Sequence, residues 1–330
     1  MKIPKKILII IQRSNGDVFL SLTLINALYN NLNSPQIDLL VNDDTLETAK
    51  LLPNINFIHT FSYKKKHEER WRQEKNLVKN IFRKYELSIN LTASDRSVIY
   101  SLLASNNSIS AIEKENNKSW WKKILLTNYY YFDKTKHILH NNLESLKFVD
   151  IEQEAILKPP NISEEVLNNV RKKLSILGIS NFIIFHPSAQ YKYKIYPQHL
   201  RDKLLAFLSK LGVSIIVTGT NNKIDTEIKN ILPSLPNIFD LIGETSLEEY
   251  LALSSLSQAY IGMDTLNMHI ASAQNKHIFA IFGPTKLSMW SPWSNQLKVS
   301  AKDDMAIQTY GNVTIFQADM PCVACGNSGC

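Results

Sequence analysis

Short apolar, β-branched runs alternate with stretches of helical periodicity along the chain. In the first half the runs predict strands at Lys6–Gln12, Gln36–Val41, Asn56–Phe61, Leu87–Leu91 and Ser108–Ile112. In the second half the pattern predicts a helix over about Ser163–Leu177 and strands at Asn181–His186, Ser214–Thr218, Ile238–Leu241, Gln258–Gly262 and His277–Phe282. Such alternation is typical of parallel strands joined by right-handed helical crossovers. The predicted fold class is therefore α/β, with two doubly wound, Rossmann-like sheets.

A polar segment around Glu152–Ser163, which contains Pro159 and Pro160, separates the two halves. Its composition is typical of a linker, and 330 residues are more than one core usually organises. We therefore expect one domain over residues 1–160 and a second over residues 161–330. Ligands of open α/β sheets bind beyond the carboxyl ends of the strands, so the two domains are expected to face a central binding cleft.

The composition narrows the class of protein. Hydrophobic residues at 44% and charged residues at 20% are ordinary for a globular chain, and 10 Gly with 12 Pro exclude a collagenous one. The apolar run Ile7–Ile11 is too short for a membrane span or a signal-peptide core. All three Cys lie in the last nine positions, which fits a reducing compartment. We expect a cytoplasmic protein.

The positive charge is concentrated in one region. The net charge is +7, and residues 61–136 alone hold 16 Lys and Arg against 8 Asp and Glu. The same region carries Trp71, Trp120, Trp121 and the run Tyr129–Tyr131. Basic residues among aromatic ones suit an anionic ligand or a membrane interface. The alternative is an ordinary solvated helix face with the aromatic side chains turned into the core.

The loop after the first strand offers one candidate acid or base. Gln12–Asp17 precede a helix that is expected to begin near Val18. Ser14, Asn15 and Gly16 are suited to a tight turn, in which Gly16 allows a close approach to the backbone. Asp17 then either acts as a general base on a hydroxyl or caps the helix.

Loops after two strands of the second half offer groups for phosphate. No G-x-G-x-x-G or G-x-x-x-x-G-K-[ST] motif occurs, so a phosphate must be held in another way. After Asn181–His186 come the Ser188 hydroxyl and the ammonium groups of Lys192 and Lys194, which can hold a diphosphate without a metal. His186 itself is better explained as a structural histidine.

A helix that begins at about Thr265 directs its positive end toward the strand ends and forms a second anion site. Asp264 either caps this helix or faces the ligand. His269 either donates to a phosphate or packs in the core.

Several of these segments match the motifs of one family, in the family's order. The matching segments are Ile7–Ile10 with Arg13–Asp17 (S-x-G-D), His186-Pro187 with Lys194 and Tyr196-Pro197 (H-P-G…K-x-W-P), Leu241–Gly243 with Ser246–Glu249 (L-x-G…S-L-x-E), Gly262–Thr265 with Met268-His269 (G-x-D-T-G-P-M-H), and Phe282–Thr285 with Trp290–Trp293 (F-G-P-T…W-x-P). With these motifs the chain resembles the ADP-heptose:lipopolysaccharide heptosyltransferases, the ninth glycosyltransferase family, whose fold is the two-domain GT-B fold.

The resemblance implies an inverting, metal-independent transferase without a cofactor. The implied reaction moves heptose from ADP-heptose to the inner core of an anionic, lipid-linked lipopolysaccharide or lipooligosaccharide acceptor, at the inner face of the cytoplasmic membrane. Asp17 would be the base and Lys194 the group beside the diphosphate. The implied acceptor-binding residues of the N-terminal domain are Ser14, Asn15 and Gly16. The implied donor-binding residues of the C-terminal domain are Ser188, Ala189, Lys192, Asp225, Asp264, Thr265 and His269.

The chain departs from the family pattern at two donor positions. Leu266-Asn267 replace the usual G-P, and Lys223 stands where the family often has a Glu for the ribose hydroxyls, so that Asp225 or Glu227 would have to substitute. The rival predictions are a different nucleotide sugar, a protein acceptor, or a non-catalytic protein that binds membranes or polyanions. Nucleic acid is not the expected partner.

The end of the chain carries cysteines with metal-like spacing. Cys322, Cys325 and Cys330 could supply three thiolates to a structural zinc or iron, or they could be free thiols. No catalytic metal is expected, because the implied mechanism uses only Asp17 and the donor loops.

Overall fold

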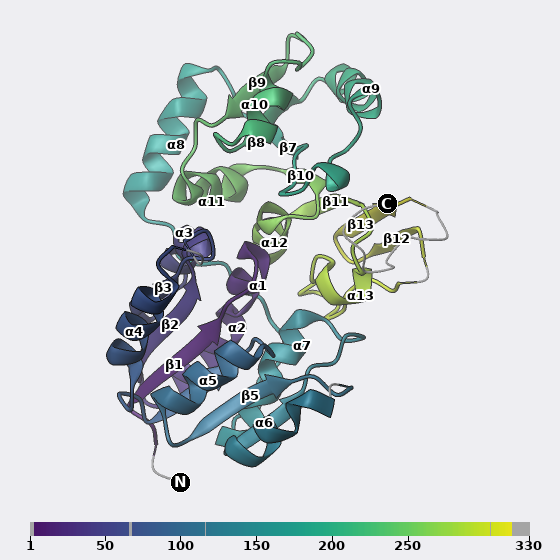
Figure 1. Ribbon diagram of the computed structural model, residues 1–330. Helices are drawn as coiled ribbons and strands as arrows, with labels where there is room; N and C mark the ends of the chain where they lie inside the picture. Colours follow the sequence, from purple (N-terminus) through teal and green to yellow (C-terminus); the bar gives the residue numbers. More distant parts are fainter. Residues whose placement is uncertain (1–2, 66–67, 116, 304, 319–330) are drawn as a thin grey trace. The chain divides into compact units, whose positions relative to one another are not determined.

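The computed structural model describes residues 3–65, 68–115, 117–303 and 305–318 (Figure 1). The chain divides into two compact units, residues 1–156 and 157–330. The division falls within the polar segment, a few residues before the expected boundary at residue 160. No helix in the described ranges is both long enough and apolar enough to cross a membrane.

Unit 1 is built on a sheet whose strands occur in the order β3-β2-β1-β4-β5-β6 and are all parallel. Its strands are β1 Lys6–Ile11, β2 Gln36–Asn42, β3 Ile55–Phe61, β4 Leu87–Asn90, β5 Ser108–Ile112 and β6 Asn128–Tyr131. Its α-helices are α1 Asn15–Leu20, α2 Leu22–Asn31, α3 Leu46–Lys50, α4 Arg70–Ile81, α5 Asp95–Ala104, α6 Trp120–Leu125 and α7 Ile138–Leu143.

The central strand of unit 1 explains why this sheet is covered on both faces. Ile7–Ile11 of β1 are all buried, so alternate side chains of one apolar run must pack against helices on opposite faces. From β1, the chain winds outward through β2 and β3, then returns to β4 and continues in the other direction. Right-handed crossovers in opposite directions place helices on both faces, as in a doubly wound fold.

Unit 2 has a sheet in the order β12-β13-β11-β10-β7-β8-β9, in which only the β12–β13 pair is antiparallel. Its strands are β7 Phe182–His186, β8 Ser214–Gly219, β9 Ile238–Ile242, β10 Ala259–Met263, β11 His277–Phe282, β12 Ile307–Tyr310 and β13 Val313–Gln317. Its α-helices are α8 Glu164–Ile176, α9 Gln198–Leu208, α10 Lys223–Lys229, α11 Leu247–Leu256, α12 Leu266–Ala273 and α13 Leu287–Trp290.

All ten strands predicted from the hydrophobic pattern are present, with ends that differ by at most one residue. The α/β class and the two doubly wound sheets are thus confirmed. The pattern missed three strands: the edge strands β6 and β12, and β13, which lies between β12 and β11. Strands β6 and β12 have only four residues each, too few to show a clear alternation in the sequence, and Asn128–Tyr131 lies in the basic, aromatic region.

Candidate functional site

In each unit the candidate residues gather at the carboxyl ends of the parallel strands. In unit 1 they follow β1. Helix α1 begins at Asn15, so the predicted start near Val18 is wrong. Ser14 is the N-cap in extended conformation, and its carbonyl already accepts the Val18 N–H at 3.0 Å. Gly16 is therefore in the first helical turn instead of a tight turn.

Asp17 lies in that first turn and is held by two neighbours. Its Oδ2 accepts a hydrogen bond of 2.7 Å from the Ser14 hydroxyl, and its Oδ1 lies 3.3 Å from Nε of Arg13. The interpretation of Asp17 as the N-cap is wrong, because Ser14 occupies that position. The residue is only 5% exposed, and the positive end of the helix stabilises a carboxylate there. Asp17 is thus a buried carboxylate in a fixed orientation.

Arg13 is a site residue that sequence reasoning did not assign. Besides its ion pair with Asp17, its guanidinium carbon lies 5.0 Å from the ring centroid of Phe132. This cation–π contact helps to hold the guanidinium group next to the carboxylate. The available signal was the spacing of four residues between Arg13 and Asp17, which places an opposite charge within reach.

Ser14 and Asn15, two of the predicted acceptor-binding residues, form different hydrogen bonds. Ser14 is exposed and donates to Asp17. Asn15 uses its Oδ1 to accept a 2.6 Å hydrogen bond from the Thr48 hydroxyl, which links α1 to α3. Their binding to an acceptor stays a prediction.

In unit 2, three loops meet at the carboxyl ends of adjacent strands. The Nζ of Lys194, which follows β7, donates to Oδ2 of Asp264, which follows β10, at 3.2 Å. An ideal Cβ on Gly283, after β11, would lie 3.7 Å from Cα of Lys194. Strand β10 pairs with both β7 and β11, which brings these loops together. The Lys194 side chain remains 23% exposed, so its ammonium group can reach a ligand.

Helix α12 starts beside this ion pair. Thr265 is its N-cap, in extended conformation, and the helix runs from Leu266 to Ala273. The alternative that Asp264 caps the helix is therefore wrong: its carboxylate pairs with Lys194 instead. The helix N-terminus and the lysine place two positive groups at one edge, which suits a diphosphate.

His186 forms a buried polar network at the end of β7. Its Nδ1 lies 3.0 Å from the amide nitrogen of Asn267 and 3.1 Å from the hydroxyl of Thr218. Its Nε2 lies 3.5 Å from the Ser188 hydroxyl. Burial lowers the pKa of His186 to about 4. The residue is a neutral, structural histidine, as the sequence indicated.

The two carboxylates considered for the ribose have different environments. Asp225 is buried, and its Oδ2 accepts hydrogen bonds from the Thr220 hydroxyl at 2.8 Å and the Asn222 amide at 2.9 Å. It therefore organises the loop between β8 and α10. Glu227 is exposed and pairs with Lys192 across 3.2 Å. Of the two, Glu227 is the carboxylate that a ligand can reach.

The remaining donor candidates are enclosed. Ser188, Ala189 and His269 are each buried. His269 lies on α12, and its buried side chain agrees with the alternative that it packs in the core. Contacts of these three residues with a donor stay predictions.

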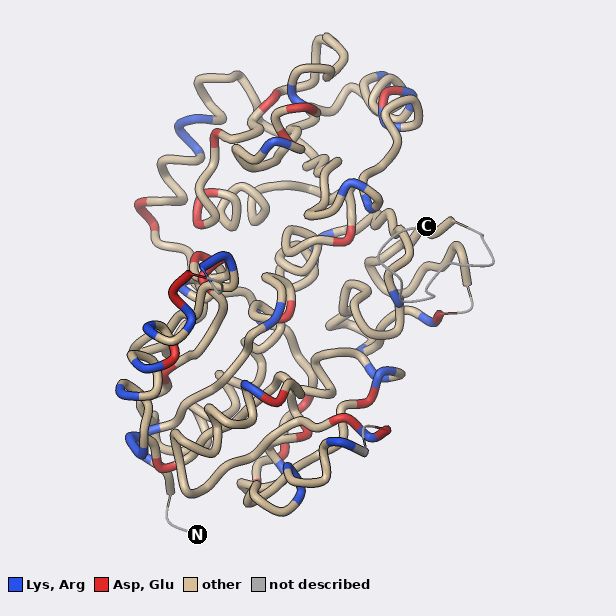
Figure 2. Tube along the Cα trace, in the orientation of Figure 1, with Lys and Arg blue, Asp and Glu red and all other residues tan. Residues whose placement is uncertain are grey.

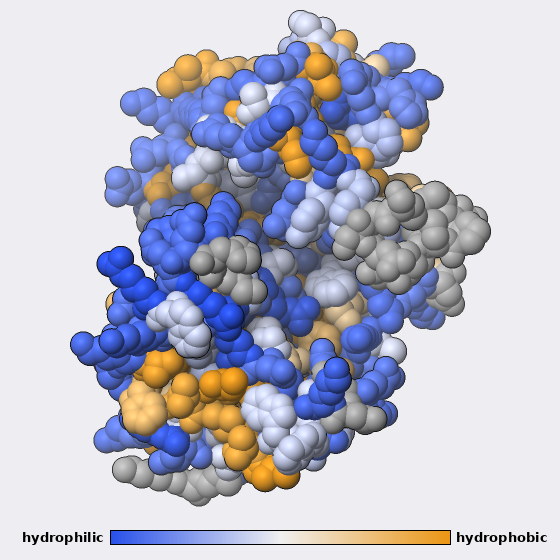
Figure 3. Space-filling view, in the orientation of Figure 1, coloured by the Kyte–Doolittle hydropathy of each residue, from blue (hydrophilic) through white to orange (hydrophobic). Residues whose placement is uncertain are grey.

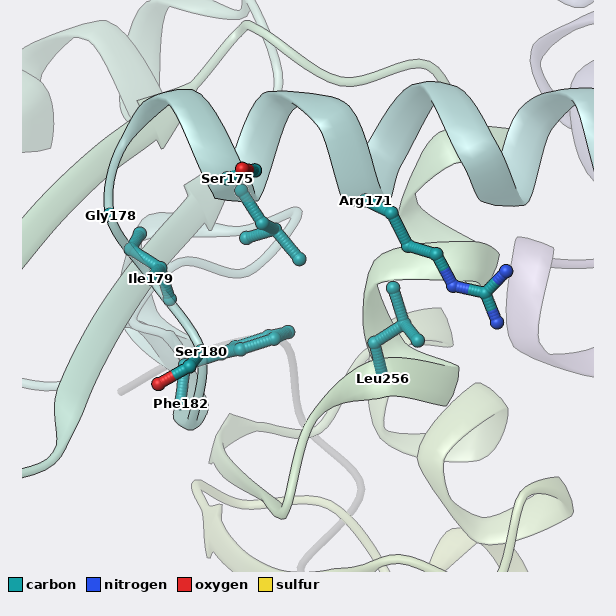
Figure 4. A pocket seen from close by; sticks show the side chains of 8 residues that line it. Arg171, Ser175, Gly178, Ile179, Ser180, Phe182 and Leu256 are labelled. Carbon is teal, nitrogen blue, oxygen red and sulfur yellow. The ribbon is translucent and has the colours of Figure 1, made fainter.

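A cavity of about 370 Å³ in unit 2 lies away from these loops. It is lined by the end of α8, the segment that leads into β7 and the end of α11, including Arg171, Gly178, Phe182 and Leu256 (Figure 4). Phe182 begins β7, whereas the candidate residues follow His186 at its other end. The cavity is therefore separate from the candidate site.

The cysteines Cys322, Cys325 and Cys330 lie outside the described residues. Among the residues that are described, no group of three or more His, Cys, Asp and Glu side chains has an arrangement suited to a metal ion. The metal prediction for the tail stays a prediction.

Comparison with known proteins gives a consistent family match. The model of glycosyltransferase family 9 (heptosyltransferase) matches residues 70–317. The lipopolysaccharide heptosyltransferase 3 of Escherichia coli is 25% identical over 294 residues, which cover 86% of this chain and 85% of that protein. The resemblance drawn from the loop motifs is thus confirmed.

Solved structures share the fold. The family 9 glycosyl transferase of Veillonella parvula has a TM-score of 0.76 at 16% identity, covering 96% of this chain and 87% of that chain. The E. coli heptosyltransferase WaaC with ADP has a TM-score of 0.72 at 13% identity, covering 95% and 93%. At these identities the match establishes the fold, which is the expected GT-B architecture.

Proposed function

The chain belongs to glycosyltransferase family 9, the heptosyltransferases, and from this premise we propose that it transfers heptose from ADP-heptose to the inner core of a lipid-linked lipopolysaccharide or lipooligosaccharide precursor. The similarity to lipopolysaccharide heptosyltransferase 3 supports the acceptor class. A fold neighbour whose structure holds ADP supports the donor nucleotide. The proposed place of the reaction is the inner face of the cytoplasmic membrane, where such a precursor would be held.

The mechanism rests on one observation. Each unit has a charged side chain at the carboxyl edge of its sheet, and each of these charges suits one half of the reaction. Unit 1 has the buried carboxylate of Asp17, and unit 2 has the ammonium group of Lys194. We assign the acceptor to unit 1 and the donor to unit 2 on this basis.

The acceptor half of the reaction needs a base. As the acceptor oxygen forms its bond to the anomeric carbon, its proton passes to the carboxylate of Asp17. Ser14 and Arg13 restrict the rotation of that carboxylate, so that its lone pairs have a fixed direction. Attack occurs on the face opposite the diphosphate, and the configuration at the anomeric carbon is inverted.

The donor half of the reaction needs positive charge near the leaving group. The bond between the anomeric carbon and the diphosphate oxygen breaks, and ADP leaves with the electron pair. Lys194 and the N-terminus of α12 stabilise the negative charge that develops on this oxygen. The Lys194–Asp264 ion pair holds the ammonium group in place before a donor binds.

The donor contacts that depart from the family pattern are assigned as follows. Glu227, exposed beside Lys192, takes the ribose hydroxyls in preference to Asp225, whose carboxylate is enclosed in its own loop. Asn267 does not project freely toward the phosphates, because its amide is bonded to His186. Of the two residues that replace the family's G-P, Asn267 is thus held by a hydrogen bond within the protein.

The test is mass spectrometry of candidate acceptors after incubation with the enzyme and ADP-heptose, with other nucleotide sugars in competition. We expect a mass increase of one heptose on an inner-core acceptor, unchanged by excess chelator because Lys194 and α12 supply the positive charge. Transfer of a different sugar would support the rival donor prediction. Labelling of a protein and not of a glycolipid would contradict the proposed acceptor.

A further inference from the structure

Helices α4, α5 and α6 form one outer layer of unit 1. Leu77 of α4 and Tyr100 of α5 belong to one buried cluster on the sheet. Val98 of α5 belongs to a second cluster, against which Trp121 of α6 packs. The end of α4 is tied to the end of α5 as well, because the Arg83 N–H donates to the Leu103 carbonyl at 2.9 Å. The outward surfaces of the three helices are therefore neighbours.

Large apolar side chains project from this layer into solvent. Trp71 at the start of α4 is 83% exposed, and Trp120 and Ile124, one turn apart on α6, are 64% and 70% exposed. Phe82, Ile99 and Leu125 are exposed as well. Figure 3 shows apolar residues gathered over α5 and α6. Monomeric proteins rarely leave such a group of large apolar side chains in water without a partner.

The same layer is positively charged. Helix α4 carries four basic residues and one acidic residue, Glu74, which is already engaged with Arg70 and with the hydroxyl of Tyr100 (Figure 2). Arg72, Lys75 and Lys79 form no ion pair with any described residue. Their charge is therefore available to an anionic partner.

Helix α6 divides its lysines between two roles. Lys122 is buried and pairs with Asp95 at 2.7 Å, which fixes α6 against α5. Lys123 is exposed, with its ammonium nitrogen 5.4 Å from the ring centroid of Tyr131. A rigidly held helix thus presents apolar side chains with a cation beside them.

These exposures favour one of the two interpretations of the basic, aromatic region. If it were an ordinary solvated face, its tryptophans would turn into the core. Trp121 does so in part, whereas Trp71 and Trp120 point outward. Trp71 in the first turn of α4 and Phe82, the C-cap directly after it, are 11 residues apart, about three helical turns, which places both on one side of this helix.

We propose that this face, formed by the outward surfaces of α4, Phe82-Arg83, α5 and α6, docks onto the anionic surface of a lipid bilayer. Trp and Phe side chains favour the headgroup region, and Ile and Leu enter the acyl boundary below it. Lys and Arg around them are attracted to anionic headgroups. A bilayer takes up both kinds of side chain at once.

The charge argues against two other occupants. A second copy docking through the same face would bring like charges together. A nucleic acid would attract the lysines but would offer nothing to Ile124 and Leu125. The docking proposal depends on the proposed function only in its biological role, which is to bring the enzyme to a lipid-linked acceptor.

The experiment measures co-flotation of the full-length protein with vesicles of phosphatidylcholine alone or mixed with phosphatidylglycerol. One variant combines Arg72→Gln, Lys75→Gln and Lys79→Gln, and a second combines Trp120→Ala and Ile124→Ala. The matched controls are Lys203→Gln with Lys210→Gln and, separately, Ile176→Ala with Phe207→Ala, all at exposed positions of unit 2. Thermal unfolding is compared to confirm that each variant folds.

We expect the wild-type protein to bind the mixed vesicles and to bind vesicles of phosphatidylcholine alone much more weakly. At roughly 1 kcal/mol for each basic residue near the surface, removing three should weaken binding by about 100-fold. Loss of the two apolar anchors should weaken it by at least about tenfold, and the controls should bind like wild type.

Equal binding of all variants, or equal losses in the unit 2 controls, would overturn the proposal. Concentration-dependent dimerisation that the α6 substitutions abolish, in the absence of vesicle binding, would assign the face to a second copy. Tighter binding to a DNA duplex than to the mixed vesicles would assign it to a polyanion. The measurement needs neither donor nor acceptor, so its failure leaves the proposed transfer intact, and failure of transfer leaves the docking result intact.

Discussion

The carboxylate of Asp17 is held by a hydroxyl and a guanidinium group, which gives a sharp expectation for its removal. In Asp17→Asn the side chain keeps its shape but can no longer take a proton. Turnover should fall on the order of 10²- to 10⁴-fold, while donor affinity changes little, because the donor is assigned to unit 2. Steady-state kinetics and calorimetric donor titration check both. Near wild-type turnover in a folded variant would remove Asp17 from the catalytic role.

Arg13→Ala serves as the matched control for this substitution. It leaves the base in place but removes the guanidinium group that helps to orient it. We expect a smaller loss of turnover than in Asp17→Asn. If the two variants were equally impaired, orientation and not proton transfer would be the main contribution of this pair.

Lys194 and Lys192 belong to the same loop but have different surroundings, so they make a matched pair. Lys194 is partly buried against Asp264, whereas Lys192 is exposed beside Glu227. Lys194→Ala should weaken donor binding and lower turnover further, because the leaving group gains charge in the transition state. Lys192→Ala should mainly weaken donor binding. Equal losses in both parameters would mean that the loop acts as a diffuse positive patch.

At the scale of elements, the approach of β10 to β7 depends on one missing side chain. An ideal Cβ on Gly262 would lie 2.5 Å from the carbonyl oxygen of His186 and 2.8 Å from the hydroxyl of Tyr260. Gly262→Ala must therefore push the strands apart, with a loss in the free energy of unfolding of about 1–3 kcal/mol. Urea denaturation measures this loss.

Gly283→Ala is the control for the strand substitution. Its Cβ would meet no atom closer than 3.7 Å, which is ordinary van der Waals contact. We expect its urea midpoint to stay close to that of wild type. A Gly262→Ala variant as stable as Gly283→Ala would show that the two strands accommodate the methyl group freely.

At the scale of the whole molecule, the buried His186 makes stability depend on pH. Burial lowers its pKa from 6.5 to about 4, so between these values the unfolded chain binds more protons than the folded one. The stabilisation is present above pH 6.5 and is lost as the pH falls toward 4. The shift corresponds to a stability change on the order of 3 kcal/mol.

His186→Asn isolates this contribution, because its side-chain amide can still form hydrogen bonds in this network but does not titrate. As the pH is lowered, the free energy of unfolding should fall more for the wild type than for the variant. Urea denaturation at several pH values checks it. Parallel curves for the two proteins would show that His186 is not the titrating group.

Some features of the fold and the candidate site could be predicted from the sequence, and others could not. The apolar run Ile7–Ile11 lies in a predicted strand, Lys6–Gln12, and the loop motifs placed Asp17, Lys194 and Asp264 after predicted strands. The edge strand β6 was missed because its four residues are too few to show the alternation that marks a strand in the sequence. The start of α1 was also misplaced, because the cap belongs to Ser14 and not to Asp17.

By itself the sequence determined the α/β class, the positions along the chain of the ten strands it detected and the family, because hydrophobic periodicity and loop chemistry are local properties of the sequence. Only the tertiary structure decided which side chains meet: Lys194 with Asp264, 70 residues apart, and His186 with Asn267, 81 residues apart. It also decided which tryptophans of the basic region face water. These facts depend on the pairing of strands and the packing of helices, which bring distant segments together and which no local pattern encodes.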